Sequence, residues 1–482
     1  MEDLKFYLLL LSLWLAATTL IRSLTSRRRH RLPPGPIPFP IIGHLPLLGP
    51  LPHRSLHHLS ATYGPVLRLR LGSSPLVVVN SPSAARDVFK THDLAFSDRP
   101  RSYASLRYAY GLPGFAFGPY GPYWRFMKRL CVSELLGGRT LDALRPIRRQ
   151  ERLRLVAALD EAAARGTIMN VSEELHKASN NGIIRMVTGM GEDGGVDEAR
   201  ELVKGVAETI GTFNLSDFVW VLRGVDVKGI KGRIDGVFKR FDKVLERIIG
   251  RKEEERRGGG GGGGDGDGVG RAKDLLDILL EVAEDDKAEF RLTRENIKGF
   301  VLDIFTAGSG TTAAVLEWAL SELINNPTIQ YKAQQELDSV VGKHRLVEES
   351  DVPNLLYLQS IVKETLRLHP PAPISHRIAT RDAKILDYDF KPERFEDVVA
   401  EEKQKNLLHY APFGGGRRGC PGASLGLDVV HVTLASLVQC FEWRVEGGRV
   451  DMEEGMGLTL PRENPLVCLP RVRLNPFPVM HV

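Results

Sequence analysis

The stretch PFGGGRRGCPGA, from Pro412 to Ala423, decides the fold that this sequence predicts. It surrounds Cys420 with five glycines, two arginines and two prolines. A structural thiol is usually buried among apolar side chains, whereas this one lies in a cationic loop of small residues. The residues that follow, Ser424 to Cys440, read as a helix whose positive N-terminal end would point back at the sulfur. The stretch is therefore typical of a ligand thiolate.

The same loop leaves other interpretations open. Gly419 and Gly422 would let backbone amides approach the sulfur, and Arg418 would supply positive charge, both of which favour a thiolate. A glycine-rich loop with two arginines could equally cradle a phosphate, or it could be a simple turn. Motifs elsewhere in the chain are needed to decide between these alternatives.

Composition excludes several classes of protein. The 482 residues include 65 lysines and arginines against 60 acidic residues, and this net charge of +5 is too small to indicate a nucleic-acid partner. The four cysteines, Cys131, Cys420, Cys440 and Cys468, contain no CxxC pair. This spacing argues against a disulfide framework or a zinc site and favours a reducing compartment.

The first residues predict a membrane anchor. Leu4 to Ile21 is almost continuously apolar and long enough to cross a bilayer. Acidic residues precede it and five arginines follow within residues 22–31, which favours an uncleaved anchor with a cytosolic domain over a cleaved signal peptide. We expect an anchor with a basic flank over residues 1–31, a proline-rich hinge over 32–43 that acts as a stiff spacer, and one domain over 44–482.

The pattern of that domain is mainly α with a small β region. Val66 to Ser81 predicts two short strands, and Thr293 to Asn325 predicts a long helix that ends before Pro327. The glycine tract of residues 256–270 predicts a disordered loop. Other helices are expected at 83–90, 123–136, 142–164, 197–212, 228–256, 272–284, 328–341, 355–368 and 424–440.

Three motifs in a fixed order resemble those of the cytochrome P-450 monooxygenases. The loop matches the family's F-x-x-G-x-R-x-C-x-G at Phe413, Gly416, Arg418, Cys420 and Gly422. Upstream, KETLRLHPP carries E-x-x-R at Glu364 and Arg367, and FKPERF carries P-E-R-F, which includes Arg394. The resemblance runs essentially end to end and implies the cytochrome P-450 fold.

The resemblance implies a haem b cofactor (iron protoporphyrin IX) held by Cys420 as the proximal ligand. Arg418 would contact a haem propionate, as would Trp124 and Lys128 of the W-x-x-x-R helix, where lysine replaces the usual arginine. Arg377 is a further candidate for a propionate contact. Glu364 and Arg367 would pair with Arg394 in a buried network, although an isolated E-x-x-R is more often a solvated surface pair.

The long helix contains AGSGTTA, from Ala307 to Ala313, which resembles the oxygen-activation stretch of the family. Ala307 and Gly308 would leave space for dioxygen, and Thr311, followed by Thr312, would help to deliver protons. Both threonines could instead bond back to a helix carbonyl. Gly310 replaces the usual acid, which removes a carboxylate from the proton relay.

A second departure from the family lies between Arg377 and Phe390. The link IATRDAKILDYD has twelve residues, and about thirty residues of short strands, turn and helix that the family places there are missing, far more than an ordinary loop-length change. We expect part of the small sheet to be lost and its edges to be left unpaired.

The stretches FAFGPYGPYWRFMKRLCVSELLGGRTL, GTFNLSDFVWVL and ETLRLHPPAPI resemble the plant branch that includes flavone synthase II and flavanone 2-hydroxylase. This implies hydroxylation or desaturation of a flavanone-like phenol, with Phe115, Phe117, Phe213 and Ile374 as pocket candidates; their alternative role is core packing. It also implies O2 and a membrane-bound NADPH-dependent reductase as partners, at the endoplasmic-reticulum membrane. The alternative is a non-catalytic or catalytically impaired haem protein, a truncated form without the roughly thirty residues that the family places before P-E-R-F.

Overall fold

The computed structural model describes residues 13, 14, 17, 32–191, 195–258, 273–390, 397–401 and 410–478. Two compact units are present. The first comprises Met1–Ser102, Phe213–Gly229 and Pro373–Gly419, and the second comprises Tyr103–Thr212, Ile230–Ala372 and Cys420–Val482. The glycine-rich loop therefore belongs to the first unit, whereas Cys420 is the first residue of the last segment of the second.

A four-stranded sheet organises the first unit, in the order β1-β2-β7-β4. β1 (Val66–Leu71) and β2 (Ser74–Val79) form the predicted antiparallel hairpin. β2 pairs in parallel with β7 (Asp397–Glu401), which pairs antiparallel with β4 (Ile374–Arg377). The β-branched run of β2 is buried from Leu76 to Val79, as expected for an inner strand.

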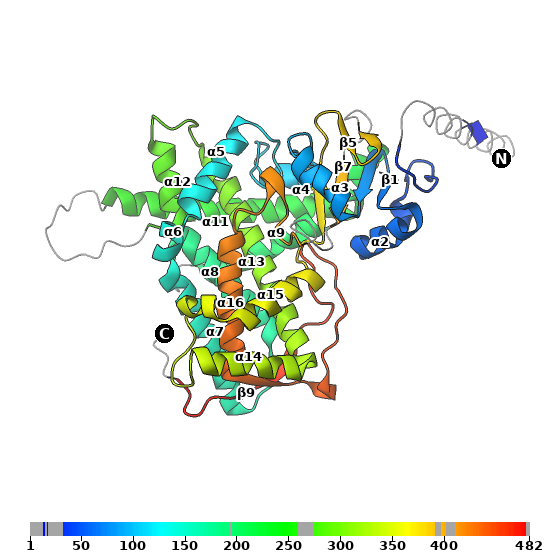
Figure 1. The fold of residues 1–482 in the computed structure, drawn as a ribbon. Helices are drawn as coiled ribbons and strands as arrows, with labels where there is room; N and C mark the ends of the chain where they lie inside the picture. The colour runs from blue at the N-terminus through cyan, green and yellow to red at the C-terminus, as the bar shows by residue number, and fades with distance from the viewer. Residues whose placement is uncertain are drawn as a thin grey trace. The chain divides into compact units, whose positions relative to one another are not determined.

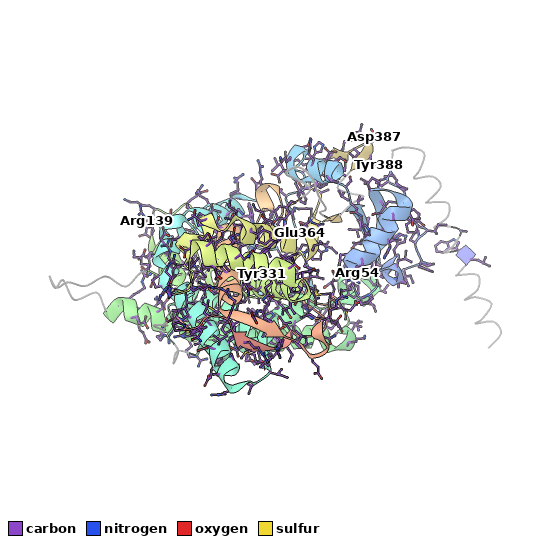
Figure 2. All side chains as sticks on the ribbon, turned by 60° about the horizontal axis from the view of Figure 1, so that its bottom comes forward. Arg54, Arg139, Tyr331, Glu364, Asp387 and Tyr388 are labelled. Atoms are coloured by element: carbon purple, nitrogen blue, oxygen red, sulfur yellow. The ribbon has the colours of Figure 1, made fainter. Side chains whose placement is uncertain are left out.

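The short link between Arg377 and Phe390 still forms strands. β5 (Ala383–Ile385) and β6 (Tyr388–Phe390) make a two-stranded hairpin, and Figure 2 labels Asp387 in its turn and Tyr388 at the start of β6. The expectation of unpaired sheet edges is wrong for β2 and β4, because β7 lies between them and pairs with both. The P-E-R-F motif at residues 392–395 lies outside the described residues.

The proline-rich segment is more than a spacer. The Pro34 carbonyl accepts the Arg68 N–H at 2.7 Å, and the Ile42 carbonyl accepts the Gly72 N–H at 3.0 Å, so residues 34–42 lie along β1. The other elements of this unit are α2 (Pro52–Tyr63), α3 (Pro82–Arg86), α10 (Leu215–Phe218), and the short turns η1 (Leu45–Leu47), η2 (Asp87–Thr91), η5 (Trp220–Leu222), η6 (Val227–Gly229) and η9 (Gly416–Arg418).

Helix α13 (Arg294–Asn325) is the centre of the second unit, as the long predicted helix required. Thr293 and Asn296 form a capping box at its start, and Asn325 precedes Asn326 and Pro327 at its end. α8 (Val171–Thr188) and α16 (Ala423–Cys440) pack against it (Figure 1). These contacts bury most of its length, which explains why it is apolar on all sides.

The remaining helices of the second unit confirm most of the predicted ranges. They are α4 (Tyr103–Tyr108), α5 (Pro122–Leu130) with η3 (Cys131–Leu135), α6 (Gly138–Ala143), α7 (Arg145–Arg165), α9 (Val196–Gly211), α11 (Ile230–Gly258), α12 (Leu275–Glu284), α14 (Pro327–Val340), η7 (Glu349–Asn354), α15 (Leu356–Leu368) and η10 (Glu446–Gly448). A small sheet has the order β3-β9-β8, from β3 (Met169–Asn170), β8 (Phe441–Arg444) and β9 (Val467–Val472).

Two described helices, α13 and α16, are long and apolar enough to span a membrane, but most of each is buried inside the unit. Both therefore read as core helices. The predicted anchor at Leu4 to Ile21 lies almost wholly outside the described residues, as does most of the glycine tract of residues 256–270.

Candidate functional site

The glycines of the loop allow it to dock closely within the first unit. Gly416 has a positive φ of +63°, and a Cβ there would lie 2.2 Å from a carboxylate oxygen of Asp93. A Cβ at Gly415 would lie 3.0 Å from Cβ of Phe89. Arg417 then fixes the loop, since its backbone N–H and its guanidinium both bond to Asp93. Only glycine fits at position 416, both sterically and by backbone conformation.

Cys420 lies just before α16 in the second unit. Its side chain is exposed, whereas Cys131, Cys440 and Cys468 are buried, and all four thiols are free. Surrounding protein atoms raise the pKa of Cys420 by desolvation, although the Gly422 N–H and the charge of Lys128 act to lower it. The structure thus supplies the predicted amide donor and cation, and its one accessible thiol is the predicted ligand.

Helix α5 carries the two other residues that the sequence assigned near the cofactor. Lys128 acts electrostatically on Cys420, so its charge serves the sulfur as well as any propionate. Trp124 is buried and its indole N–H donates to the Phe115 carbonyl at 2.9 Å. A propionate contact by Trp124 stays a prediction, and it would have to share this N–H.

The first unit gathers three arginines around β4. Arg377 and Arg418 are buried; the Arg418 Nε donates to the Ser97 carbonyl at 2.6 Å. Arg99, which no sequence motif singled out, donates to the His376 carbonyl at 2.7 Å. Desolvation by the surrounding protein atoms, together with the charges of Arg99 and Arg377, lowers the pKa of His376 to about 4. Both guanidinium groups therefore lie close to His376.

This arginine cluster fits an anionic group. Burial lowers the pKa of Arg99 to about 10, and no acidic side chain among the described residues pairs with it. Its Nε is buried and has no hydrogen-bond partner in the described part of the chain. A buried guanidinium N–H without an acceptor is costly, so the cluster suits an anionic group such as the carboxylates of a haem. No local signal in the sequence singles out Arg99.

The middle of α13 carries the predicted oxygen-activation residues. The Thr311 hydroxyl donates to the Ala307 carbonyl at 2.8 Å, and the Thr312 hydroxyl donates to the Gly308 carbonyl at 3.2 Å. Both therefore bond back to the helix, as one interpretation of the sequence held. Ala307 is exposed and Thr311 half-buried, whereas Thr312 is buried. Ala307 and Thr311, one turn apart, are thus the accessible members of this stretch.

The two glycines of this stretch have different surroundings. A Cβ at Gly308 would lie 2.8 Å from Cδ1 of Ile183, so the glycine permits close packing of α13 on α8. The expectation that Gly308 provides space for dioxygen stays a prediction, and close packing on Ile183 is a second role for this glycine. A Cβ at Gly310 would lie 3.7 Å from Cγ2 and 3.9 Å from Oγ1 of Thr459, which is ordinary contact.

The four substrate candidates do not form one group within either unit. Phe115 belongs to the second unit, where its ring stacks on Trp124 with centroids 5.9 Å apart and contacts Phe300 at 5.2 Å. Phe117 is half-buried in the same segment. In the first unit, Phe213 is 54% exposed and stacks on Phe218, and Ile374 packs under β1 and β2. Phe413, at the start of the cysteine motif, is half-buried in the first unit.

The E-x-x-R pair departs from the expected buried network. Glu364 and Arg367 form a bidentate pair at 2.7 Å and less on α15, but the Glu364 side chain is 55% exposed; Figure 2 labels it there. The prediction of burial is wrong, because Leu358, Val362 and Leu366 occupy the buried face of this helix. Arg394 lies outside the described residues.

Comparisons with known proteins agree with these features. The protein-family model Cytochrome P450 matches residues 33–391 and 389–469. The 3,9-dihydroxypterocarpan 6A-monooxygenase of Glycine max is 43% identical, with 94% of this chain and 95% of the relative covered. The beta-amyrin 24-hydroxylase of Glycine max is 41% identical over 519 residues, with 99% of this chain and all of the relative covered. A zebrafish cytochrome P450 structure with progesterone gives a TM-score of 0.74 at 24% identity, covering 87% of this chain and 99% of that one.

Proposed function

We infer the function of this chain from the fact that it belongs to the cytochrome P450 family. It is a monooxygenase, as its relatives are, and membership of this family implies a haem iron cofactor. We propose that it oxidises a flat phenolic compound of the flavonoid class, by hydroxylation or by desaturation of a flavanone. The proposal rests on the sequence resemblance, on the aromatic cluster around Phe115, and on the pterocarpan named for one relative.

The accessible thiol of Cys420 carries the proposal. When bound, the haem supplies oxygen activation at its iron. Cys420 would hold the iron as a thiolate, and the Gly422 N–H and the charge of Lys128 would favour the negative sulfur against the desolvation that raises its pKa. In the first unit, Arg377 and Arg418 would be partners for haem carboxylates, and Arg99 offers a third guanidinium group beside His376.

The residues of α13 act on the substrate side. Ala307 presents only a methyl group, which leaves room for a ligand beside the helix. The Thr311 hydroxyl donates to the Ala307 carbonyl, and its oxygen can accept a hydrogen bond from water. Rotated away from that carbonyl, the hydroxyl would pass its proton to a bound ligand and take another from solvent water. Gly310 adds no acidic group to this relay.

We further propose an endoplasmic-reticulum membrane anchor and a membrane-bound NADPH-dependent reductase as the electron donor. Arg125 and Lys128 on α5 are the cationic groups that would meet an acidic reductase face. Arg129 contributes less than its charge suggests, because it forms an ion pair with Glu289.

A reduced carbon monoxide difference spectrum and a turnover assay test the proposal together. The haem-loaded protein should show the red-shifted Soret band of thiolate ligation and should oxidise a flavanone with NADPH and reductase. A band without turnover of any flavanone would reject the substrate class. Absence of the band would reject the thiolate assignment.

The alternative is a catalytically impaired or non-catalytic haem protein whose chain lacks a segment before the P-E-R-F motif. Two observations favour it: the family match is in two parts that meet at residues 389–391, and the 519-residue alignment is longer than the 482 residues of the chain. Sequencing the transcript across Arg377 to Phe390 tests it. If the segment is absent from the transcript, haem uptake should be compared with that of a chain in which a relative's segment is inserted.

A further inference from the structure

Asp303 on α13 holds the backbone of the segment that carries Phe115. One carboxylate oxygen, Oδ2, accepts the N–H of Phe115 at 3.1 Å and the N–H of Ala116 at 3.0 Å. The other oxygen, Oδ1, has no hydrogen bond to any residue in the described part of the chain. Asp303 thus uses half of its capacity to accept hydrogen bonds.

The charge of Asp303 is not needed for these two bonds. Burial raises the pKa of Asp303 to about 6, and the two amides lower it only in part. No cation contributes to that pKa, so at neutral pH an ionised carboxylate sits here without a positive partner. An asparagine carbonyl would accept the same two amides at a smaller desolvation cost. The negative charge therefore points to a further partner.

The neighbours of Asp303 are aromatic and do not occupy Oδ1. Phe300 lies one turn earlier on α13, and its ring contacts that of Phe115 at 5.2 Å. Burial raises the pKa of the Tyr123 hydroxyl to about 12, and the nearby charge of Asp303 adds to the rise. This hydroxyl bonds to the Asn296 side chain. The carboxylate thus stands at the edge of an aromatic cluster.

Asp303 also lies on the accessible side of α13. It precedes Ala307 by four residues, so the two share one face of the helix, and Ala307 is exposed while Asp303 is half-buried. Thr311 continues this face by one more turn. An aromatic molecule beside Ala307 that reached one turn toward the start of α13 would bring its far end to Asp303.

We propose that Asp303 is a specificity-determining residue, in which Oδ1 accepts a hydrogen bond from a hydroxyl group of the substrate while Oδ2 holds the backbone of residues 115–116. This rests on the proposed function, because it assigns one contact of the same substrate. A phenol suits the site, since its ring packs on Phe115 and its hydroxyl donates to the carboxylate. The enzyme should therefore favour substrates with a hydroxyl group at the end remote from the reacting carbon.

The test compares two probes that differ by one hydroxyl group, 4-phenylphenol and biphenyl. Their Kd values are measured from the absorbance change that each causes in the haem-loaded full-length protein. The wild type should bind 4-phenylphenol at least about tenfold more tightly, as expected for a hydrogen bond to a charged acceptor. Asp303→Asn should reduce this ratio at least about threefold, since its free group is an amide donor. Asp451→Asn, at an exposed acid that bonds to Asn464, is the control and should leave the ratio unchanged.

Hydrogen exchange of the apoprotein provides a second readout. The amides of residues 115 and 116 should exchange slowly in the wild type and in Asp303→Asn, and faster in Asp303→Leu, which has no acceptor. Equal Kd ratios in the wild type and Asp303→Asn would overturn the proposal, as would a wild-type ratio near one. Fast exchange at 115–116 in the wild type would overturn the role of Oδ2. Failure to oxidise any flavanone, with the Kd ratio as expected, would reject the proposed substrate class alone.

Discussion

Trp124 and Phe115 are joined twice in the second unit. The Trp124 indole N–H donates to the Phe115 carbonyl at 2.9 Å, and the two rings stack with an interplanar angle of 13°. Because Asp303 holds the N–H of the same residue, Phe115 connects α13 to α5 through its backbone and its ring. The residue expected to touch a haem propionate and the residue expected to touch substrate are therefore positioned by one another.

Trp124→Phe should destabilise the apoprotein. The substitution keeps the stacked ring but removes the N–H, so the Phe115 carbonyl loses its donor, at a cost of about 1–2 kcal/mol in the free energy of unfolding. Denaturant unfolding measures this cost. Trp443→Phe is the matched control, because the Trp443 N–H is buried and unpartnered within the described residues. That variant should be at least as stable as the wild type, and an equal loss in both would contradict the prediction.

Cys420→Ser should abolish the thiolate-type band of the reduced carbon monoxide complex. A serine hydroxyl is a far weaker ligand for haem iron than a thiolate, so the spectrum should shift even if haem is still retained. Cys468→Ala removes a buried thiol elsewhere in the second unit and should keep the band. An unchanged spectrum in Cys420→Ser would remove the ligand assignment.

The sequence was sufficient for most of the fold. Caps and periodicity placed α13 within a residue, because Thr293 and the Asn326–Pro327 pair are local signals. α8 was missed, since the Ser179–Gly182 stretch SNNG reads as a turn; packing on α13 keeps it helical. The pairing of β7 between β2 and β4 was not predictable either, because a parallel neighbour from so far along the chain has no local signature.

The site was predicted less completely than the fold. Motif spacing identified Cys420 and Lys128, which interact electrostatically, and Thr311, whose hydroxyl bonds back to the Ala307 carbonyl; their catalytic roles stay predictions. Arg99 and Asp303 were missed, because a single charged residue shows its importance only when its burial and its missing partners are known. The predicted burial of Glu364 was wrong for the converse reason, since helical spacing does not say which face of α15 is buried.

Asp303→Asn should make the stability of the apoprotein less sensitive to pH. The pKa of Asp303 is raised from 3.8 to about 6. The stabilisation that comes from protonated Asp303 is thus fully present below the pKa of the unfolded state. It is lost as the pH rises through the pKa of the folded state. Between about pH 4.5 and pH 7.5, Asp303→Asn should gain about 2 kcal/mol in unfolding free energy relative to the wild type.

Urea unfolding across this pH range measures the difference. Asp451→Asn provides a control of opposite sign, because a hydrogen bond from Asn464 lowers the pKa of this exposed carboxyl. The stability of Asp451→Asn relative to the wild type should not rise with pH. A pH-independent difference for Asp303→Asn would show that folding does not raise the pKa of Asp303.

Gly308→Ala and Gly310→Ala should have opposite effects on stability. The two positions are two residues apart on α13, and each alanine gains up to about 1 kcal/mol of helix propensity. At Gly308 the new methyl group meets Ile183 at 2.8 Å, and overpacking should leave a net loss of about 1 kcal/mol or more. At Gly310 the nearest atom is 3.7 Å away, so the gain should remain. Thermal unfolding of the two variants measures both effects. A lower melting temperature for Gly310→Ala would contradict the prediction that its methyl group fits beside Thr459.

Gly310→Asp should raise the amount of product formed per NADPH consumed. A carboxylate at this position restores an acid next to Thr311, and its side chain would extend toward the Thr459 hydroxyl, which can donate to it. We expect the ratio to rise about twofold or more, because acid–base groups commonly contribute far larger factors to proton transfer. Gly310→Ala separates the carboxylate from the stiffer helix and should leave the ratio unchanged. If both variants raise the ratio equally, the carboxylate is not the cause of the gain; if neither does, water already fills the place of the acid in the relay.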